Sequence, residues 1–309
     1  MTQSDRMQYR RQKRLQRSAA LWSALEPFAY LLPFMVSIAI FTLYPVFNVV
    51  LMSFKEGFRM LTGQYTAIGL GNYAYVINDK YFANALTNTA LYVAFVVPIS
   101  TVLAVVLANL LNRKVRGMAL FQTSYFLPMV TSITASGLAW KFMFSRDFGV
   151  INQVLSWFGV DKINWLQSPS WNIYALIIYG IWSILPFTII LLLSGLQNID
   201  ETYYTAARVD GAKSGRIFFR ITVPMLAPTI GLVLTINTIS SSKVFNELYP
   251  LFNGRPGHSY NLYTVVYYIF DQFYSKSKAG RAAAAALILF LIIFVITMLQ
   301  QLIQRKWTH

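Results

Sequence analysis

Residues 200–228 read DETYYTAARVDGAKSGRIFFRITVPMLAP, a polar interruption in an otherwise strongly apolar chain. The first part predicts a short helix, in which the small side chains of Ala206 and Ala207 let another surface approach the backbone closely. Gly211 can adopt the left-handed conformation that ends a helix. Pro224 then opens a long apolar segment as a first-turn proline. The stretch therefore predicts a helix, a turn and a second helix.

The composition indicates a membrane protein. Of 309 residues, 56% are hydrophobic and only 12% are charged, whereas about a quarter of the residues in a soluble domain are charged. The net charge of +15 is spread over segments between apolar runs, which favours a role in membrane topology over nucleic-acid binding. The chain has no cysteine, and its two histidines lie outside the apolar runs. Disulfides and thiolate zinc sites are thus excluded, and histidine metal sites are disfavoured.

Six apolar runs are long enough to cross a membrane, which takes about 20 residues each. They predict an all-α integral membrane protein with six transmembrane helices. Several prolines lie inside the runs, and we expect them to kink membrane helices because neighbouring helices can satisfy the freed backbone groups. The runs are residues 28–53, 86–111, 120–144, 172–196, 224–249 and 280–304, and the prolines are Pro33, Pro45, Pro98, Pro128 and Pro186.

The distribution of lysine and arginine predicts the orientation. Basic residues concentrate in the two tails, in the turn around Arg113, and in the loop that contains Gly211, so these four segments are expected on the cytoplasmic side. The amino-terminal tail is basic like a signal peptide, but the apolar run after it is too long and lacks a cleavage site. The expected organisation is a cytoplasmic tail (1–25), a first transmembrane helix (26–54), an extracytoplasmic loop (55–85), a five-helix core (86–304) that includes the loop 197–223, and a second tail (305–309).

The spacing within residues 200–228 resembles the EAA loop of ABC-importer permeases, through Ala206-Ala207, Gly211 and Val223-Pro224. In that family the loop carries a short coupling helix that docks into a groove on a cytoplasmic ATPase. Thr205 stands where the family usually has glutamate. We hypothesise that Glu201, one helical turn earlier, partly replaces that carboxylate. The alternative is an ordinary basic loop between two membrane helices.

The resemblance extends over roughly residues 65–300 and includes Gly69–Tyr73, Gly195–Ile199 and Lys243–Pro250. It implies a type I importer permease fold with a coupling surface on the cytoplasmic side. The residues that it assigns to ATPase coupling are Glu201, Tyr203, Tyr204, Thr205, Ala206, Ala207, Asp210 and Gly211.

The same resemblance implies the partners. Members of this family that import carbohydrate work with a second, homologous permease, two ATP-binding subunits and an extracytoplasmic solute-binding protein. The chain itself has no G-x-x-x-x-G-K-[ST] motif, so it is expected to be a transport subunit that is not an enzyme and binds no cofactor, with ATP and magnesium held by its partners. A heterodimer of permeases in the cytoplasmic membrane of a bacterium or archaeon is expected. The substrate is a sugar or oligosaccharide, with glycerol-3-phosphate or another polyol derivative as the alternative.

Polar residues near the end of the fifth run are the candidates for the substrate pathway: Asn237, Ser240, Lys243, Asn246 and Glu247. Polar groups at membrane depth are costly unless they face protein or water. In a continuous helix Ser240, Lys243 and Glu247 would share one face, which fits the wall of an aqueous cavity. Alternatively they hold helices together, with Lys243 and Glu247 paired.

Two other classes of function need residues that the chain lacks. A gradient-driven carrier usually relays protons or ions through buried acids, but only Glu247 lies inside a predicted span and Glu26 at an edge. A membrane hydrolase would need a catalytic pair or a metal cluster. Lys141, near the outer end of the third run, is expected to extend to the interface. The loop Asn253–Gly257 is either an external gate or a simple turn.

Overall fold

Long apolar runs become long helices in the computed structural model, which describes residues 26–28, 30–112, 118–257 and 260–307. The first elements are η1 (Ala39–Leu43), α2 (Tyr44–Phe54), β1 (Lys55–Glu56), β2 (Ala67–Ile68), α3 (Gly71–Asn78), α4 (Lys80–Leu111), α5 (Met118–Val130), α6 (Ile133–Met143) and α7 (Val150–Ser156). They are followed by α8 (Asn172–Gln197), α9 (Glu201–Val209), α10 (Ser214–Ile217), η2 (Phe218–Thr222), α11 (Val223–Ser241), α12 (Leu248–Phe252), α13 (Val265–Phe270), η4 (Asp271–Ser275) and α14 (Ala279–Trp307). The predicted basic tail 1–25 and the basic turn around Arg113 lie outside the described residues.

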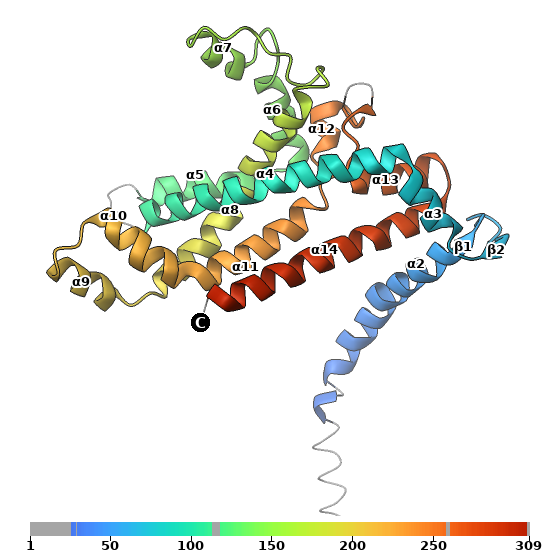
Figure 1. Ribbon diagram of the computed structural model, residues 1–309, viewed down its shortest axis with the longest axis horizontal. Helices are drawn as coiled ribbons and strands as arrows, with labels where there is room; N and C mark the ends of the chain where they lie inside the picture. Colours follow the sequence, from blue (N-terminus) through green and yellow to red (C-terminus); the bar gives the residue numbers. More distant parts are fainter. Residues whose placement is uncertain (1–25, 29, 113–117, 258–259, 308–309) are drawn as a thin grey trace, which may run out of the picture.

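The predicted all-α class is confirmed, and its minor exception is the two-residue antiparallel ladder of β1 and β2. Five helices in the described part of the chain are long and apolar enough to cross a membrane: Tyr30–Phe54, Lys80–Leu111, Asn172–Gln197, Ser214–Ser241 and Ala279–Lys306. Figure 1 shows α9, α10 and the carboxyl end of α14 at one end of the bundle, and α3 with the β1–β2 hairpin at the other.

The third predicted span is not one continuous helix, so the count of six is not matched within the described residues. It divides into α5 and α6 at Thr131 and Ser132, where Ser132 adopts an extended ψ of 134°. Pro128 weakens the end of α5 because it lacks an N–H. The Thr131 hydroxyl also donates to the Leu127 carbonyl at 2.7 Å, a side-chain bond that competes with helix continuation.

The fifth predicted span is shifted toward the amino terminus. The helix begins at Ser214, runs through η2, and ends at Ser241, eight residues before the predicted end. Beyond that point side chains satisfy the backbone: Thr264 donates to the Val244 carbonyl at 2.8 Å, and Glu247 accepts from the Phe245 N–H at 3.2 Å. These side-chain bonds, one from a distant residue and one local, replace the helical ladder, so the chain leaves the helix.

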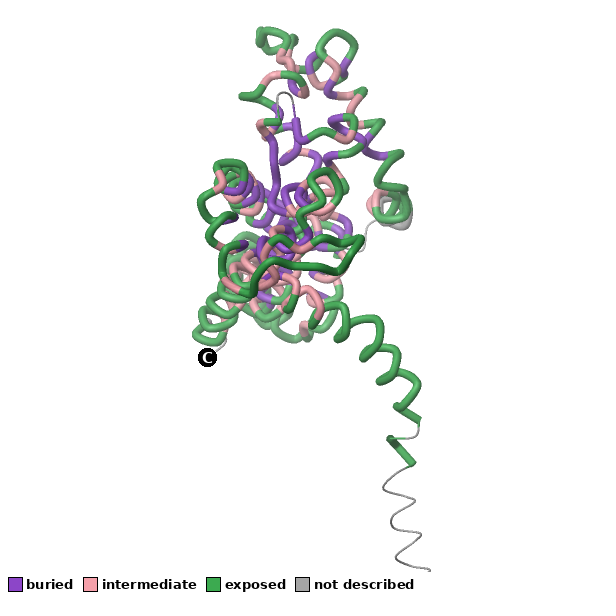
Figure 2. Tube along the Cα trace, turned by 90° about the vertical axis from the view of Figure 1, so that its right-hand side faces the viewer, coloured by how far each residue is buried: buried purple, intermediate pink, exposed green. Residues whose placement is uncertain are grey.

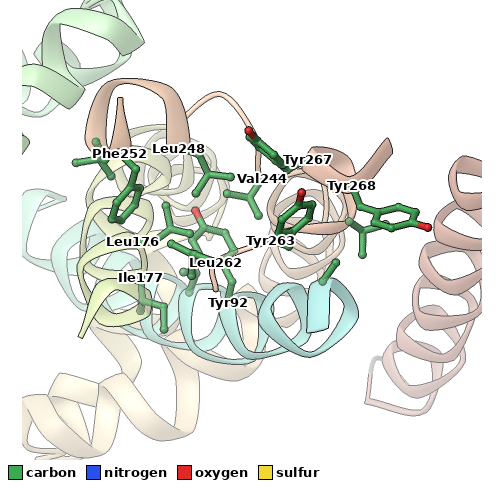
Figure 3. Close-up of a cluster of buried hydrophobic side chains, with 14 of the residues drawn as sticks. Tyr92, Leu176, Ile177, Val244, Leu248, Phe252, Leu262, Tyr263, Tyr267 and Tyr268 are labelled. Carbon is green, nitrogen blue, oxygen red and sulfur yellow. The ribbon is translucent and has the colours of Figure 1, made fainter. Parts of the chain in front are cut away.

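Two buried clusters occupy opposite halves of the bundle, in which α4 packs along α8 and α11 packs against both. The aromatic cluster lies where α4 and α8 begin and includes Phe82, Tyr179 and Tyr268. Figure 3 shows part of it, with side chains from several segments pointing toward one another. The aliphatic cluster, where α4 and α8 end, has only alanine, valine, leucine and isoleucine among its buried members. Figure 2 shows that the first candidate span, Tyr30–Phe54, is exposed along most of its length.

An amide seam joins α14 to α11. The Gln300 side chain donates to the Thr238 hydroxyl at 2.8 Å, and Gln304 donates to the Gly231 carbonyl at 2.8 Å and to the Thr235 hydroxyl at 3.4 Å. A Cβ atom at Gly231 would lie 2.6 Å from the Gln304 side-chain carbon, so glycine permits this close approach. The seam fixes the rotation of α14 against α11.

Candidate functional site

The helix α9 is set at its start by a side-chain cap. Asp200 has an extended backbone, and its carboxylate accepts a hydrogen bond from the Thr202 N–H at 2.9 Å. This bond satisfies one of the amide donors that a helix leaves open at its first turn. The hydrogen bonds from Thr202 lower the pKa of the Asp200 carboxyl below its ordinary value. The cap therefore favours the ionised form, which also suits the helix dipole.

The end of α9 is a Schellman motif. The N–H of Ala212 donates to the Ala207 carbonyl at 2.9 Å, and the N–H of Gly211 donates to the Arg208 carbonyl at 3.0 Å. This pair of bonds requires a left-handed conformation at the first residue beyond the helix cap. Gly211 occupies that position, with φ of 74°. No atom lies within 4 Å of a Cβ built at Gly211. The glycine is thus required here by backbone conformation, not by crowding within the chain.

One face of α9 lies over a cavity of about 670 Å³. Glu201, Tyr204 and Arg208 line it, three residues that share a helix face by their spacing. The remaining lining comes from the ends of α4 and α8 and from α10 and η2: Asn109, Asn112, Leu196, Gln197, Ile199, Ser214, Ile217, Phe218 and Thr222. Within the described residues α9 packs only sparsely against other helices. It is held mainly by its two caps.

The opposite face of α9 is exposed and partly apolar. Val209 is 83% exposed and Tyr203 is 54% exposed, and Ala206 lies between them on the same face. Exposed apolar side chains that lie outside the membrane-spanning segments indicate a contact with another molecule. The small Ala206 side chain would let a partner approach the helix backbone.

The structure divides the eight predicted coupling residues between these faces. Ala207 is buried at 9% exposure, and Glu201 and Tyr204 turn toward the cavity. Glu201 is itself exposed, and the other exposed members of the predicted set are Tyr203, Thr205, Ala206, Asp210 and Gly211. Because Glu201 lines the cavity, its replacement of a carboxylate at position 205 stays a hypothesis.

The predicted substrate-pathway residues are not all brought together. Asn237 is buried and donates to the Thr188 hydroxyl of α8 at 3.0 Å, a contact that joins two helices. Ser240 is exposed near the end of α11. The prediction that Lys243 and Glu247 continue the same helical face is wrong, because α11 ends at Ser241. Lys243 and Asn246 are exposed in the irregular segment that follows.

Lys141, predicted near the outer end of the third run, lies in α6, and its ammonium donates to the side-chain carbonyl of Asn253 in the predicted outer loop. The loop Asn253–Gly257 contains three left-handed residues, with φ of 57° at Asn253 and 73° at Gly254 and Gly257. The Tyr267 hydroxyl donates to the Gly254 carbonyl at 3.1 Å, so the loop is tied to α13.

Asparagine side chains hold this loop region in place. Asn88 of α4 donates to the carbonyls of Asn261 and Tyr263 at 2.9 Å each. Asn172 at the start of α8 is fully buried and donates to the Asn261 side chain at 2.7 Å. An asparagine within the first turns of a long apolar helix is the signal that would have marked them.

Acidic residues do not converge in the described part of the chain. No group of three or more histidine, cysteine, aspartate or glutamate residues there is placed to hold a metal ion. Glu247, the one acid inside a predicted span, lies beyond the end of α11, and its carboxylate accepts the Phe245 N–H.

The chain is similar to known transport proteins. The family model described as "Binding-protein-dependent transport system inner membrane component" matches residues 100–309, which include α9 and both of its caps. The arabinooligosaccharides transport system permease protein of Halalkalibacterium halodurans is 33% identical over 277 residues, covering 89% of this chain and 86% of that protein. The lactose transport system permease protein of Rhizobium radiobacter is 34% identical, covering 88% of this chain and 91% of that protein.

A solved structure has the same fold. It is a bacterial alginate ABC transporter in complex with its alginate pentasaccharide-bound periplasmic protein. One of its chains superposes with a TM-score of 0.79 and 26% sequence identity, covering 93% of this chain and 98% of that chain. The likeness confirms the predicted importer permease fold.

Proposed function

We propose a sugar-import function for this chain, which belongs to the family of binding-protein-dependent transport system inner membrane components. It is a transport subunit that forms part of the translocation pathway for a sugar or oligosaccharide delivered by a solute-binding protein. The observation that carries this proposal is the family match over residues 100–309 together with similarity to permeases named for arabinooligosaccharides and lactose.

The helix α9 is proposed as the point at which ATP hydrolysis by partner subunits acts on this chain. Tyr203, Ala206 and Val209 form its exposed face and would enter a groove of the ATPase. ATP and magnesium would be held by two such subunits, and a second permease would complete the pathway. Since the end of α14 lies at the same end of the bundle as α9, both are assigned to the cytoplasmic side, in agreement with the basic residues Arg305 and Lys306.

Movement of α9 would be passed to the bundle through η2 and α11. The helix from Ser214 to Ser241 is one long element, so a push at its α10 end moves the whole element relative to α4 and α8. Rocking of this permease against its partner would expose the pathway alternately to the two sides of the membrane. The polar residues Ser240, in the last turn of α11, and Lys243 and Asn246, in the segment after it, remain the proposed contacts with the substrate.

The ATPase contact is tested by co-purification in mild detergent. Tagged wild-type chain is expected to recover an ATPase and a second permease. The variant Ala206→Trp should lose the ATPase, because the large side chain blocks close approach to α9. The matched control is Ala74→Trp, which places the same side chain at an exposed alanine of α3, at the opposite end of the bundle. Recovery of the ATPase with Ala206→Trp at the wild-type level would contradict the assignment.

The substrate class is tested separately in the assembled transporter. Stimulation of ATP hydrolysis is measured with the solute-binding protein and either neutral oligosaccharides or glycerol-3-phosphate. We expect stimulation by an oligosaccharide, because the neutral polar groups of Ser240 and Asn246 suit sugar hydroxyls. Stimulation by glycerol-3-phosphate alone would favour the polyol alternative. A folded chain that transports without any ATPase would favour a gradient-driven carrier.

A further inference from the structure

A second polar cavity lies at the end of the bundle opposite α9 and has no part in the proposed function. Its volume is about 500 Å³, and it is enclosed by the β1–β2 hairpin, the start of α3 and the start of α14. Figure 1 shows these three elements meeting at one corner of the molecule. The side chains that matter for its chemistry are Glu56, Arg59, Tyr75, Lys278 and Arg281.

The lining of this cavity is positively charged. Arg59, Lys278 and Arg281 contribute three cations against the single carboxylate of Glu56. That carboxylate is already engaged, since it accepts the Gly71 N–H at 2.7 Å. The two ion pairs recorded among the described residues, Lys162–Asp147 and Lys276–Asp271, include none of these cations. The cavity therefore has an excess of positive charge and favours an anionic ligand.

Arg281, one of the two arginines in the cavity, is held against an aromatic ring. The Arg281 guanidinium carbon lies 3.5 Å from the centroid of the Tyr75 ring. A guanidinium that lies over an aromatic ring keeps its N–H groups free at its edge. There they can bind two oxygens of one anion. Planar, bidentate binding of this kind is typical of arginine with phosphate.

The walls of the cavity are fixed independently of any ligand. The Asn72 side chain donates to the carbonyls of Ser53 and Lys55 at 3.0 Å each, which ties α3 to the end of α2. A Cβ at Gly280 would lie 2.6 Å from the Asn72 side-chain nitrogen, so α14 approaches this corner closely. The basic groups thus project from a preformed frame.

The ends of two candidate spans place this cavity at the expected boundary between hydrocarbon and headgroups. One candidate span ends at Phe54, directly before the hairpin, and another begins at Ala279, two residues before Arg281. These two helices pack together, and they carry exposed apolar side chains such as Leu51 and Leu291 away from the cavity. Basic side chains at such a boundary are attracted to anionic lipid, and the adjoining apolar surface suits acyl chains.

We propose that this cavity binds the headgroup phosphate of an anionic phospholipid, with Arg281 and Lys278 as its principal ligands and Arg59 of the hairpin as a third. The shared chemistry is that of a phosphate anion, which a lipid or free phosphate could supply. The position at the ends of two spans favours the lipid. A bound lipid would link the hairpin, α2 and α14.

The experiment measures lipid binding to the full chain, purified in detergent and delipidated, by native mass spectrometry. The probes are dioctanoylphosphatidylglycerol, dioctanoylphosphatidylcholine and inorganic phosphate. We expect the wild-type chain to bind the phosphatidylglycerol at least about fivefold more tightly than the phosphatidylcholine, because each basic group near the headgroup contributes about that factor. The variant Lys278→Gln/Arg281→Gln should lose most of this preference.

The matched control is Arg146→Gln/Lys162→Gln, which removes the same charge from a different outer loop and should keep the preference. Lys278→Gln alone, at an exposed side chain, serves if the double variant unfolds, and should lower the affinity for phosphatidylglycerol about fivefold. An equal loss in the control pair, or no loss in the cavity variants, would overturn the proposal. Displacement of the lipid by an equal concentration of inorganic phosphate would assign the site to a free anion and overturn the lipid.

Discussion

The two halves of the bundle are packed differently. Near the starts of α4 and α8 the helices pack around the aromatic cluster. Near their ends the helices pack around the aliphatic cluster, and α9 lies over a cavity. In the first region rings interlock, as in the edge-on contact of Phe82 with Tyr268 at 5.2 Å. The Tyr268 hydroxyl also donates to Asp79 at 2.8 Å. In the second region smooth aliphatic side chains meet a helix held by its caps.

The difference separates a fixed region from a movable one. Interlocked rings with directed hydrogen bonds have one preferred arrangement, so they resist sliding. Alanine, valine and leucine surfaces allow small shifts between helices at lower cost, and a helix with few packing contacts can be displaced without unfolding the core. An element that must receive a push from a partner belongs in the second region.

The largest expected effect tests the fixed region. Phe82→Ala removes a side chain that is 2% exposed, and the cavity should cost about 3–5 kcal/mol of stability. Thermal unfolding of the purified chain should show a clear fall in midpoint temperature. Tyr203→Ala, on the exposed face of α9, should leave the midpoint unchanged and lower transport. Equal midpoints for both variants would remove the distinction between the two regions.

The next effect concerns the cap of the movable region. Gly211→Val should abolish most transport, because a β-branched residue at φ of 74° is strained by about 1–2 kcal/mol or more. Gly211→Asn should retain much of it, since asparagine tolerates the left-handed conformation. Uptake assays and membrane insertion are measured for both. Similar failure of the two variants would mean that the partner, rather than the backbone, requires glycine.

A smaller effect is expected at the other cap. Asp200→Ala should accelerate amide hydrogen exchange in the first turn of α9, whereas Asp200→Ser should preserve it because serine also caps. The folded-state pKa of Asp200 is lowered, so its stabilising effect is complete above the ordinary carboxyl pKa and is lost as the pH falls through the lowered value. Exchange in this turn should therefore show no capping loss near neutral pH. A loss between pH 6 and 8 would contradict the assigned cap.

The smallest effect is expected on the exposed side of the same helix. Thr205→Glu restores the residue usual in the family and should change transport by less than about twofold, because an exposed carboxylate contributes little. A large gain in ATPase-coupled transport would mean that Thr205 weakens the coupling in this chain. Thr205→Gln, which adds a side chain of similar length without the charge, is the control.

The long helices could be predicted because membrane spans are set by apolar length alone. The break between α5 and α6 could not, since Pro128 is tolerated within many helices and only the Thr131 bond and the turn at Ser132 end this one. The end of α11 at Ser241 likewise depends on a distant residue, Thr264, which takes up the Val244 carbonyl. Thr264 lies outside residues 224–249, so the apolar pattern of that run does not reveal where the helix ends.

The local features of the candidate site could be predicted from the sequence, but its contacts between distant segments could not. Glycine at position 211 marked the end of α9 correctly, because its left-handed conformation is a local property. Which side of α9 faces the bundle depends on the ends of α4 and α8, so the separation of Tyr204 from Tyr203 required the structure. The bond between Asn172 and Asn261 spans a long sequence separation and was missed for the same reason.

The amide seam has a consequence for biosynthesis. An apolar helix in lipid has no strong reason to prefer one rotation over another, since all its faces are equally soluble. Gln300 and Gln304 bond to groups on α11, which is synthesised before α14. The final long helix of the chain is therefore oriented by a template already in the membrane, and each nascent chain aligns its last segment by two amide contacts.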